Sequence, residues 1–273
     1  MKSFRIKDYK GSKEFISRYM TNKREYAFIH YACQSFYEAQ CENSPRIVAI
    51  CILFAGNNQV FVFSLASLAE REGIDLSQAD NKVIDDLENK MLTEFFGFLK
   101  QEKNTKSIKY WLHWNMKDQN YGFEAISQRY CKLNRRKKAP YQIDNEARVN
   151  ISAVLSQRYG DNYAPHPRLQ NILEMNNIKP MNLLNGKEEA TAFDNKEYLA
   201  IDRSVQAKVQ AFSEVLNRVG NDELKTNSRP LKDIYGISIS GILLYLKENV
   251  IFGILSSAVG GIIINYLYDL IFK

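Results

Sequence analysis

Residues 110–130, YWLHWNMKDQNYGFEAISQRY, contain the pattern that decides the fold. The apolar and aromatic run SIKYWLHWN (107–115) is typical of a buried strand, and GFEAISQRYCKL (122–133) has the spacing of a helix. A strand that passes through a polar turn into a helix favours a mixed α/β sheet. Polar and aromatic side chains fill the turn, so we expect a candidate site there.

Upstream of this stretch, the chain has three further apolar runs. These are EYAFIHYACQSFYE (25–38), RIVAICILFAG (46–56) and QVFVFSL (59–65), and GNN (56–58) lies between the last two. Glycine and asparagine accept positive φ, so GNN predicts a hairpin turn and the three runs predict mostly antiparallel strands. The segment 79–103 then places apolar residues at helical spacing, which predicts an amphipathic helix.

Downstream, the pattern becomes helical. Residues 146–178 indicate two helical pieces interrupted at YGDNYAPHP (159–167), and residues 187–219 indicate a helical hairpin that ends at Gly220. The apolar piece 234–246 is too short to cross a bilayer and is interpreted as an interfacial or bundle helix.

The last stretch, VIFGILSSAVGGIIINYLYDLIF (250–272), is apolar with one charge. Its length of roughly 35 Å exceeds the hydrocarbon core of about 30 Å, so it predicts a transmembrane helix, with a buried core helix as the alternative. Cationic residues before it predict an inner-membrane protein with a cytoplasmic N-terminal part. Small and polar residues on one face predict an oligomer contact or pore, against a plain tail anchor: Gly253, Ser257, Gly260, Gly261, Asn265 and Asp269.

Composition sets broader bounds. The 37 Lys and Arg residues against 31 Asp and Glu leave a formal charge of +6, which is compatible with an anionic partner. Four cysteines without a CxxC pair indicate neither a zinc cluster nor a disulfide framework. The charged N-terminus excludes a secretory signal peptide. No nucleotide-binding glycine loop, Ser/His/Asp arrangement or HExxH helix is present.

The order of these elements over roughly residues 25–178 resembles the DEDDh exonucleases, which have the ribonuclease H-like fold. The order is three strands, a helix, a strand ending in an Asn, a helix, and a late helix with a His. The resemblance implies an α/β domain with a ribonuclease H-like mixed sheet, followed here by a helical hairpin and the C-terminal transmembrane helix. We expect domains at 1–182 (exonuclease-like), 183–247 (helical linker) and 248–273 (transmembrane helix).

The motifs of that family are altered in this chain. In the family, the first strand carries Asp-x-Glu, whereas this sequence has His30 and Ala32 at those positions. The last family motif is His-x4-Asp, and here His166 is followed at the Asp position by Asn171. Asn115 is retained, but Phe123-Glu124 comes after a longer turn. Carboxylates hold the paired metal ions of such sites, so we predict no catalytic residue, no metal and no cofactor. The alternative is a metal-dependent 3′-5′ exonuclease that recruits Glu38, Glu42, Asp118 or Glu124.

A nuclease fold without its ligands keeps a cleft suited to single strands, so we predict a single-stranded DNA oligomer as partner. Cations follow phosphates and aromatic rings stack on bases. The predicted nucleic-acid-binding residues are Asn115, Tyr121, Phe123, Arg129, Lys132, Arg135, Arg136, Lys137, Lys138 and His166. The alternatives are a solvated basic loop and, for the aromatic residues, packing in the core.

The combination of an altered nuclease domain with a membrane helix is similar to membrane effectors of bacterial antiphage systems such as Hailong. The resemblance implies a homotetrameric ion channel held shut by DNA oligomers from a companion nucleotidyltransferase. The competing hypotheses are a membrane-tethered exonuclease and a tail-anchored binding module with neither channel nor catalysis.

Overall fold

The computed structural model describes residues 2–34, 44–116, 121–248, 258 and 260–261. The chain divides into two compact units. One comprises residues 15–154 and 166–225, and the other residues 1–14, 155–165 and 226–273. The larger unit contains the sheet.

The sheet has five strands in the order β3-β2-β1-β4-β5. They are β1 (Tyr26–Cys33), β2 (Ile47–Phe54), β3 (Val60–Ser64), β4 (Tyr110–His113) and β5 (Arg148–Asn150). The first three are antiparallel neighbours, with Ile29 opposite Ile52 and Ile50 opposite Phe63. Strand β4 pairs in parallel with both β1 and β5, so the sheet is mixed, as the sequence predicts.

The turn between β2 and β3 forms at GNN, as predicted. Asn58 has a φ of 57°, and Phe54 N donates to Gln59 O at 2.9 Å. A Cβ on Gly56 would lie 2.7 Å from Arg24 Cγ and 2.8 Å from Arg24 Cα, so the close approach of the η1 turn (Lys23–Glu25) requires glycine there.

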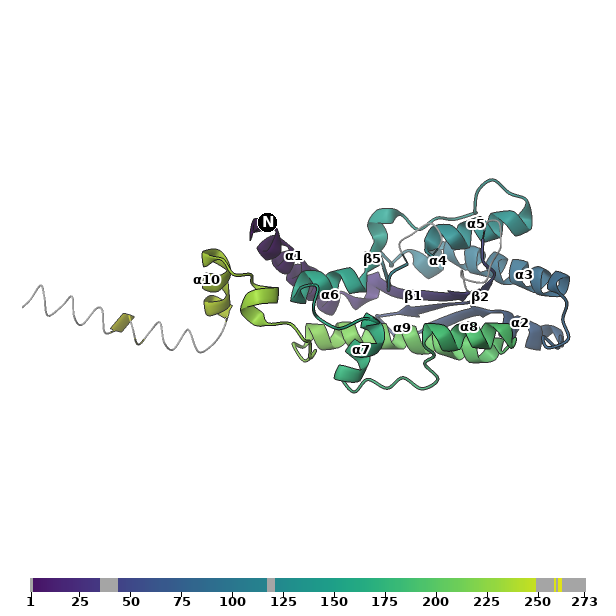
Figure 1. Ribbon diagram of the computed structural model, residues 1–273. Helices are drawn as coiled ribbons and strands as arrows, with labels where there is room; N and C mark the ends of the chain where they lie inside the picture. The colour runs from purple at the N-terminus through teal and green to yellow at the C-terminus, as the bar shows by residue number, and fades with distance from the viewer. Residues whose placement is uncertain (1, 35–43, 117–120, 249–257, 259, 262–273) are drawn as a thin grey trace, which may run out of the picture. The chain divides into compact units, whose positions relative to one another are not determined.

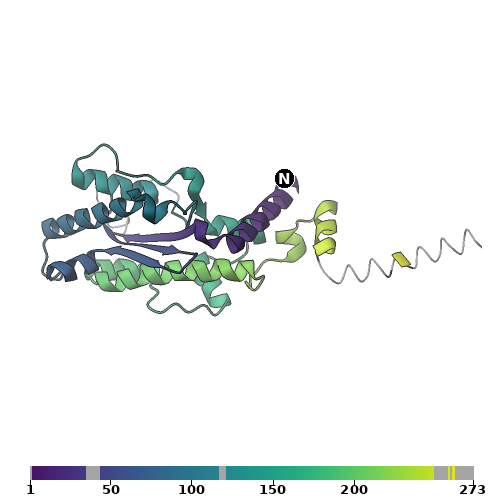
Figure 2. The same ribbon diagram turned by 180° about the vertical axis from the view of Figure 1, so that it is seen from behind.

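Helices cover both faces of the sheet (Figures 1 and 2). Helix α3 (Asn81–Lys100) contacts β2 and β3 and packs against α5 (Phe123–Asn134), while α9 (Tyr198–Gly220) contacts β1, β2 and β3 on the other face. Burial on both faces explains why β1 and β2 read as continuous apolar runs rather than alternating ones.

Shorter helices complete the larger unit. Helix α2 (Leu65–Glu72) begins where the Ser64 side chain accepts from Ser67 N, and α3 begins at the Asp80 cap. The predicted hairpin at 187–219 is formed by α8 (Gly186–Asp194) and α9, which pack on each other. The remaining elements are α4 (Glu102–Thr105), η2 (Asn145–Ala147) and α7 (Arg168–Met175).

Elements of the smaller unit include the start of α1 (Lys2–Thr21), the end of α6 (Ile151–Tyr159), η3 (Pro230–Ile234) and α10 (Ile239–Glu248). The Arg5 guanidinium donates to the carbonyl oxygens of Gln157 (2.5 Å), Asp233 (2.7 Å) and Arg158 (3.1 Å). The bonds to Gln157 and Arg158 satisfy carbonyl groups at the end of α6, which a helix leaves without intrahelical partners, and the bond to Asp233 joins α1 to η3.

The structure corrects the predicted transmembrane helix at 248–273, and with it the predicted inner-membrane localisation and ion channel. Within the described ranges, no helix combines the length and the apolar character needed to cross a bilayer. Helix α10 has ten residues and spans about 15 Å, half of the hydrocarbon core. Most of the predicted span, residues 249–257, 259 and 262–273, lies outside the described residues.

Two secondary-structure elements also differ from those that the sequence predicts. The N-terminal helix α1 was not expected from the sequence, and residues 148–150, predicted to be helical, form the edge strand β5 before α6 begins. A three-residue strand is too short to show an alternating pattern.

Candidate nucleic-acid interface

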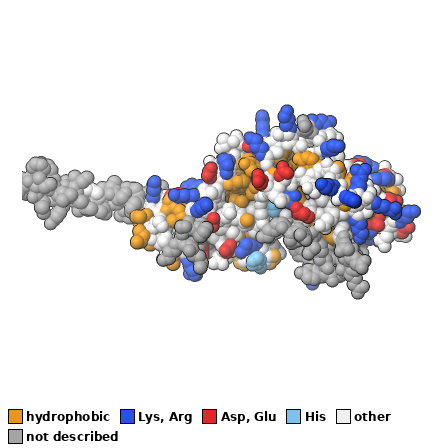
Figure 3. All heavy atoms as spheres, turned by 90° about the horizontal axis from the view of Figure 1, so that it is seen from above, with side chains coloured by type: hydrophobic (Ala, Val, Ile, Leu, Met, Phe, Trp, Pro, Cys, Tyr) orange, Lys and Arg blue, Asp and Glu red, His pale blue; other side chains and the backbone are white. Residues whose placement is uncertain are grey.

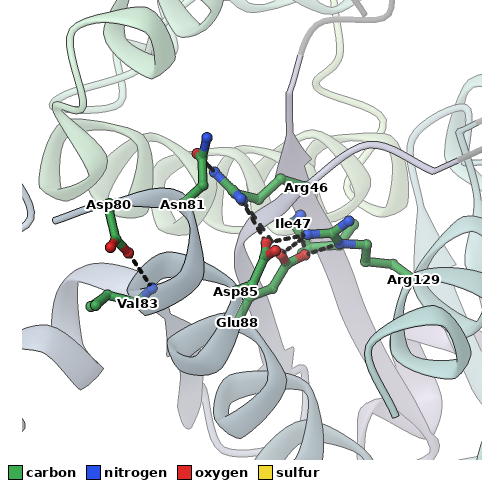
Figure 4. A network of polar contacts seen from close by, with 8 residues as sticks. All are labelled: Arg46, Ile47, Asp80, Asn81, Val83, Asp85, Glu88 and Arg129. Atoms are coloured by element: carbon green, nitrogen blue, oxygen red, sulfur yellow. Dashed lines mark hydrogen bonds and ion pairs between the residues drawn. The ribbon is translucent and has the colours of Figure 1, made fainter. Parts of the chain in front are cut away.

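A buried ion network links α3, α5 and the start of β2 (Figure 4). Glu88 of α3 is fully buried and accepts from Arg129 Nε at 2.8 Å, from Arg129 Nη2 at 2.5 Å and from Ile47 N at 2.7 Å. Asp85 lies one turn earlier on the same face of α3 and pairs with Arg129 at 2.9 Å and with Arg46 at 2.6 Å. Two carboxylates of one helix thus hold two arginines from distant segments.

Burial and ion pairing together set the pKa values of Glu88 and Arg129. It raises the pKa of Glu88, and the hydrogen bonds and charge of Arg129 offset only part of that effect. Burial by itself would lower the pKa of Arg129, but hydrogen bonds to Glu88 and the nearby carboxylates outweigh it, so this pKa is raised. Arg129 therefore serves inside the fold as the counter-ion of Glu88.

A cavity of about 750 Å³ adjoins the network, where β1 ends and β2 begins. Cationic side chains from three segments line it: Arg46 before β2, Lys82 on α3, and Arg129 and Lys132 on α5 with Arg135 just after it. Its carboxylates are Asp85 and Asp86, and its amides are Gln34, Asn81 and Asn89. Counting Glu88, which pairs with Arg129 beside the cavity, five cations face three carboxylates, so the cavity is electropositive and suits an anionic ligand.

A second cavity of about 460 Å³ lies on the other flank of α5. Lys137 and Lys138 line it together with Glu124, which forms an ion pair with Arg148. Helix α5 ends at Asn134, and the next residue, Arg135, has a left-handed φ of 49°, so the chain changes direction there. The predicted basic segment 129–138 is therefore divided between two cavities.

Figure 3 shows the side of the chain on which α3 and α5 lie. Lys and Arg side chains are spread over this side, with Asp and Glu among them. Within the basic segment, Arg129 is only 7% exposed. The other cations of the segment are exposed: Lys132, Arg135, Arg136, Lys137 and Lys138. Arg136 lines neither of the two cavities.

The structure places the other predicted binding residues in different surroundings. Asn115 follows β4, where its Oδ1 accepts from Asn150 Nδ2 and its backbone N donates to Asn150 Oδ1, each at 3.1 Å. Tyr121 donates its hydroxyl to Tyr31 O at 3.2 Å, and Phe123 is 6% exposed. The Phe123 ring thus packs in the core, while the half-buried Tyr121 ring stacks on Tyr31 with their centroids 4.9 Å apart.

Three other predicted positions, His166, Gly260 and Gly261, lie among the described residues. His166 is exposed immediately before α7. Gly260 and Gly261 have helical backbone, and a Cβ on either would meet nothing within 4 Å. The remaining predicted pore residues, Gly253, Ser257, Asn265 and Asp269, lie outside the described residues.

In place of the expected acids, β1 carries His30 and Ala32, both buried. Burial lowers the pKa of His30 well below its ordinary value, and the charges of Lys208 and His113 add to this effect. Across the described ranges, no cluster of three His, Cys, Asp or Glu side chains is arranged to hold a metal ion. Glu38, Glu42 and Asp118 lie outside those ranges.

The sequence did not indicate that Arg46 and Lys82 belong to the interface. They precede the predicted basic segment by 40 residues or more and join it only through the pairing of β2 with β1 and the packing of α3 on α5. Comparisons of the chain with protein-family models, with curated proteins and with solved structures find no match.

Proposed function

We propose that the chain binds single-stranded DNA without cleaving it, at the electropositive cavity between α3 and α5. The observation that carries this proposal is the convergence of five cationic side chains on that cavity. Phosphate contacts supply most of the affinity in binding that is independent of sequence. The order of strands and helices, which resembles the DEDDh exonucleases, supports a nucleic acid as the ligand.

The lining of the cavity indicates how the DNA is recognised. None of the described residues that line it is aromatic. Base stacking on a ring, which adds about 1–3 kcal/mol per base, therefore contributes little there. Binding should depend on the phosphates and strongly on salt. The Gln34 amide can reach base edges, whereas the Oδ1 atoms of Asn81 and Asn89 already accept from Arg46 and Asn134.

Binding without cleavage is expected because His30 and Ala32 occupy the positions that the family fills with carboxylates. A pair of metal ions needs those carboxylates to activate water. The channel and antiphage roles depended on the predicted transmembrane helix, so the proposal is confined to DNA binding. The homotetramer and the companion nucleotidyltransferase stay predictions.

The test is a fluorescence-anisotropy titration of a labelled oligothymidine at about 0.1 M salt. The variant Lys132→Gln/Arg135→Gln removes two exposed cations from the cavity. The loss of two phosphate contacts on a single strand should weaken binding about 25-fold, since each contributes about 0.7 to the salt slope.

The matched control is Lys137→Gln/Lys138→Gln. It removes the same charge from the same basic segment, but at the other cavity, and should change the affinity by less than about threefold. Equal losses in the two variants would show that general charge, and not this cavity, holds the DNA. Absence of binding at low salt would refute the proposal. Incubation with Mg²⁺ should leave the oligonucleotide at full length.

A further inference from the structure

A further cavity lies on the opposite face of the sheet, beside α9. Helix α7, the segment 176–185 and the start of α8 enclose a cavity of about 630 Å³ with α9. Figures 1 and 2 show these helices on the side of the sheet away from α3 and α5. The cavity is thus separate from the electropositive one, and its volume is in the range of sites for small organic ligands.

Hydrogen bonds fix the walls of this cavity at both ends. Asn176, which is buried, donates from Nδ2 to Ile172 O (2.8 Å) and Lys225 O (2.9 Å) and accepts at Oδ1 from Lys225 N (2.8 Å). Arg218 Nη1 donates to Asn176 O at 2.6 Å. At the other end, Ser204 Oγ accepts from Leu184 N at 3.1 Å. The cavity is therefore formed before any ligand arrives, which lowers the entropic cost of binding.

Its lining combines an apolar surface with one buried cation. Leu169, Leu173, Ile178 and Leu183 supply apolar wall, and Lys208 of α9 lies at 8% exposure. The Lys208 ammonium pairs with Glu189 Oε1 at 2.6 Å. An ammonium has three donors, and within the described residues Glu189 is the one acceptor placed at contact distance from it. A buried ammonium gains from further acceptors, because leaving donors unsatisfied costs free energy.

The carboxylates around this cavity already have partners. Glu188 Oε2 accepts from Asn185 N at 2.7 Å, and Glu174 accepts from Gln170 at 3.0 Å. The Asn185 side chain caps Lys187 N and Glu188 N at the start of α8, so the helix terminus is satisfied from within. The polar group of this cavity that still has hydrogen-bond donors to offer a ligand is therefore the Lys208 ammonium.

We propose that this cavity binds a small amphipathic anion whose apolar body lies against the leucines and whose single carboxylate or phosphate accepts from Lys208. The apolar wall excludes a polynucleotide as the natural occupant, because a polynucleotide would have to bring a phosphate at every residue into it. The cations that line the cavity, Lys179, Lys187 and Lys208, outnumber its carboxylates, Glu174 and Glu188, which favours an anion.

Isothermal titration calorimetry with three probes that share a naphthyl ring tests this proposal. The probes are 1-naphthoate, 1-naphthyl phosphate and neutral 1-naphthalenemethanol. At least one anion should bind saturably, and tenfold or more tightly than the alcohol. Preference for one anion identifies the head group as carboxylate or phosphate. Equal affinity for the alcohol, or no saturable binding of either anion, would overturn the proposal.

Two variants and a control locate the probe. Lys208→Met should lower the affinity for the anions to that of the alcohol and leave the alcohol unchanged. Leu183→Trp fills the cavity without altering a charge and should weaken all three probes, which keeps the test decisive if Lys208→Met folds poorly. Lys137→Met, in a cavity on the other face, should change nothing. Unchanged anion binding in both cavity variants would place the probes elsewhere and overturn the assignment.

Discussion

Replacement of Arg129 by Met removes the main counter-ion of Glu88 and should destabilise the larger unit by about 3–5 kcal/mol, the usual cost of breaking a buried ion pair. Glu88 would lose the hydrogen bonds from Arg129 Nε and Nη2 and keep those of Ile47 N and, at 3.6 Å, the charge of Arg46. Each charged hydrogen bond contributes about 1.5–3 kcal/mol, which agrees with that range.

The double variant Arg129→Met/Glu88→Gln provides the matched control. Glutamine keeps an acceptor for Ile47 N and removes the buried charge, so the total cost should fall to about 1–2 kcal/mol. Urea unfolding followed by fluorescence measures both values. The chain has two tryptophans, Trp111 and Trp114, and both are buried in the larger unit.

The result also distinguishes two roles for Arg129. A residue that serves only as a phosphate ligand would lose DNA affinity on substitution and leave the free energy of unfolding unchanged. A cost below about 1 kcal/mol for Arg129→Met would refute the assignment of Arg129 as the counter-ion of a buried carboxylate.

Three further substitutions test other parts of the fold. Burial lowers the pKa of His30, so the contribution of the neutral imidazole to stability is complete above the unfolded pKa of about 6.5 and is lost as the pH falls. Between pH 6.5 and 5.5, the free energy of unfolding in urea should fall by about 1 kcal/mol more for the wild type than for His30→Leu. Parallel plots of that free energy against pH would contradict this prediction. Asn176→Ala leaves Lys225 N without its acceptor and should cost about 2–3 kcal/mol in the same assay, whereas a cost near zero would show that water replaces the amide. Gly160→Ala places a Cβ 2.5 Å from Asp233 O at a φ of 88°, so hydrogen exchange of the Asp233 amide should accelerate, and unchanged exchange would mean that the segment shifts without cost.

Much of the sheet could be predicted because its signals are local. The apolar runs of β1, β2 and β3, the GNN turn and the helical spacing of α3 each depend on residues close in sequence. Helix α1 was missed although its buried residues Tyr9, Ile16 and Tyr19 recur at helical spacing, because so few apolar residues in a charged segment give only a weak pattern.

The candidate site was only partly predictable because its geometry is non-local. The sequence showed a basic segment, but it did not show that Arg129 faces inward to Glu88, 41 residues earlier. It also did not show that a left-handed residue at position 135 directs Lys137 and Lys138 to the other flank of α5. A charge that a helix turns inward can be distinguished from a surface charge only when the partner element is known.

The division of cations within the electropositive cavity makes a quantitative prediction about DNA binding. Arg46 and Arg129 are held by Asp85 and Glu88, whereas the other three cations are exposed. We therefore expect Lys82, Lys132 and Arg135 to contact the phosphates and release counter-ions from the DNA. At about 0.7 per phosphate, three contacts give a salt slope of about −2, whereas five would give about −3.5. Anisotropy titrations between about 0.05 and 0.3 M salt separate these values. A slope near −3.5 would mean that DNA displaces the carboxylates from Arg46 and Arg129. The ion network of Asp85 and Glu88 would then not stay intact when DNA binds.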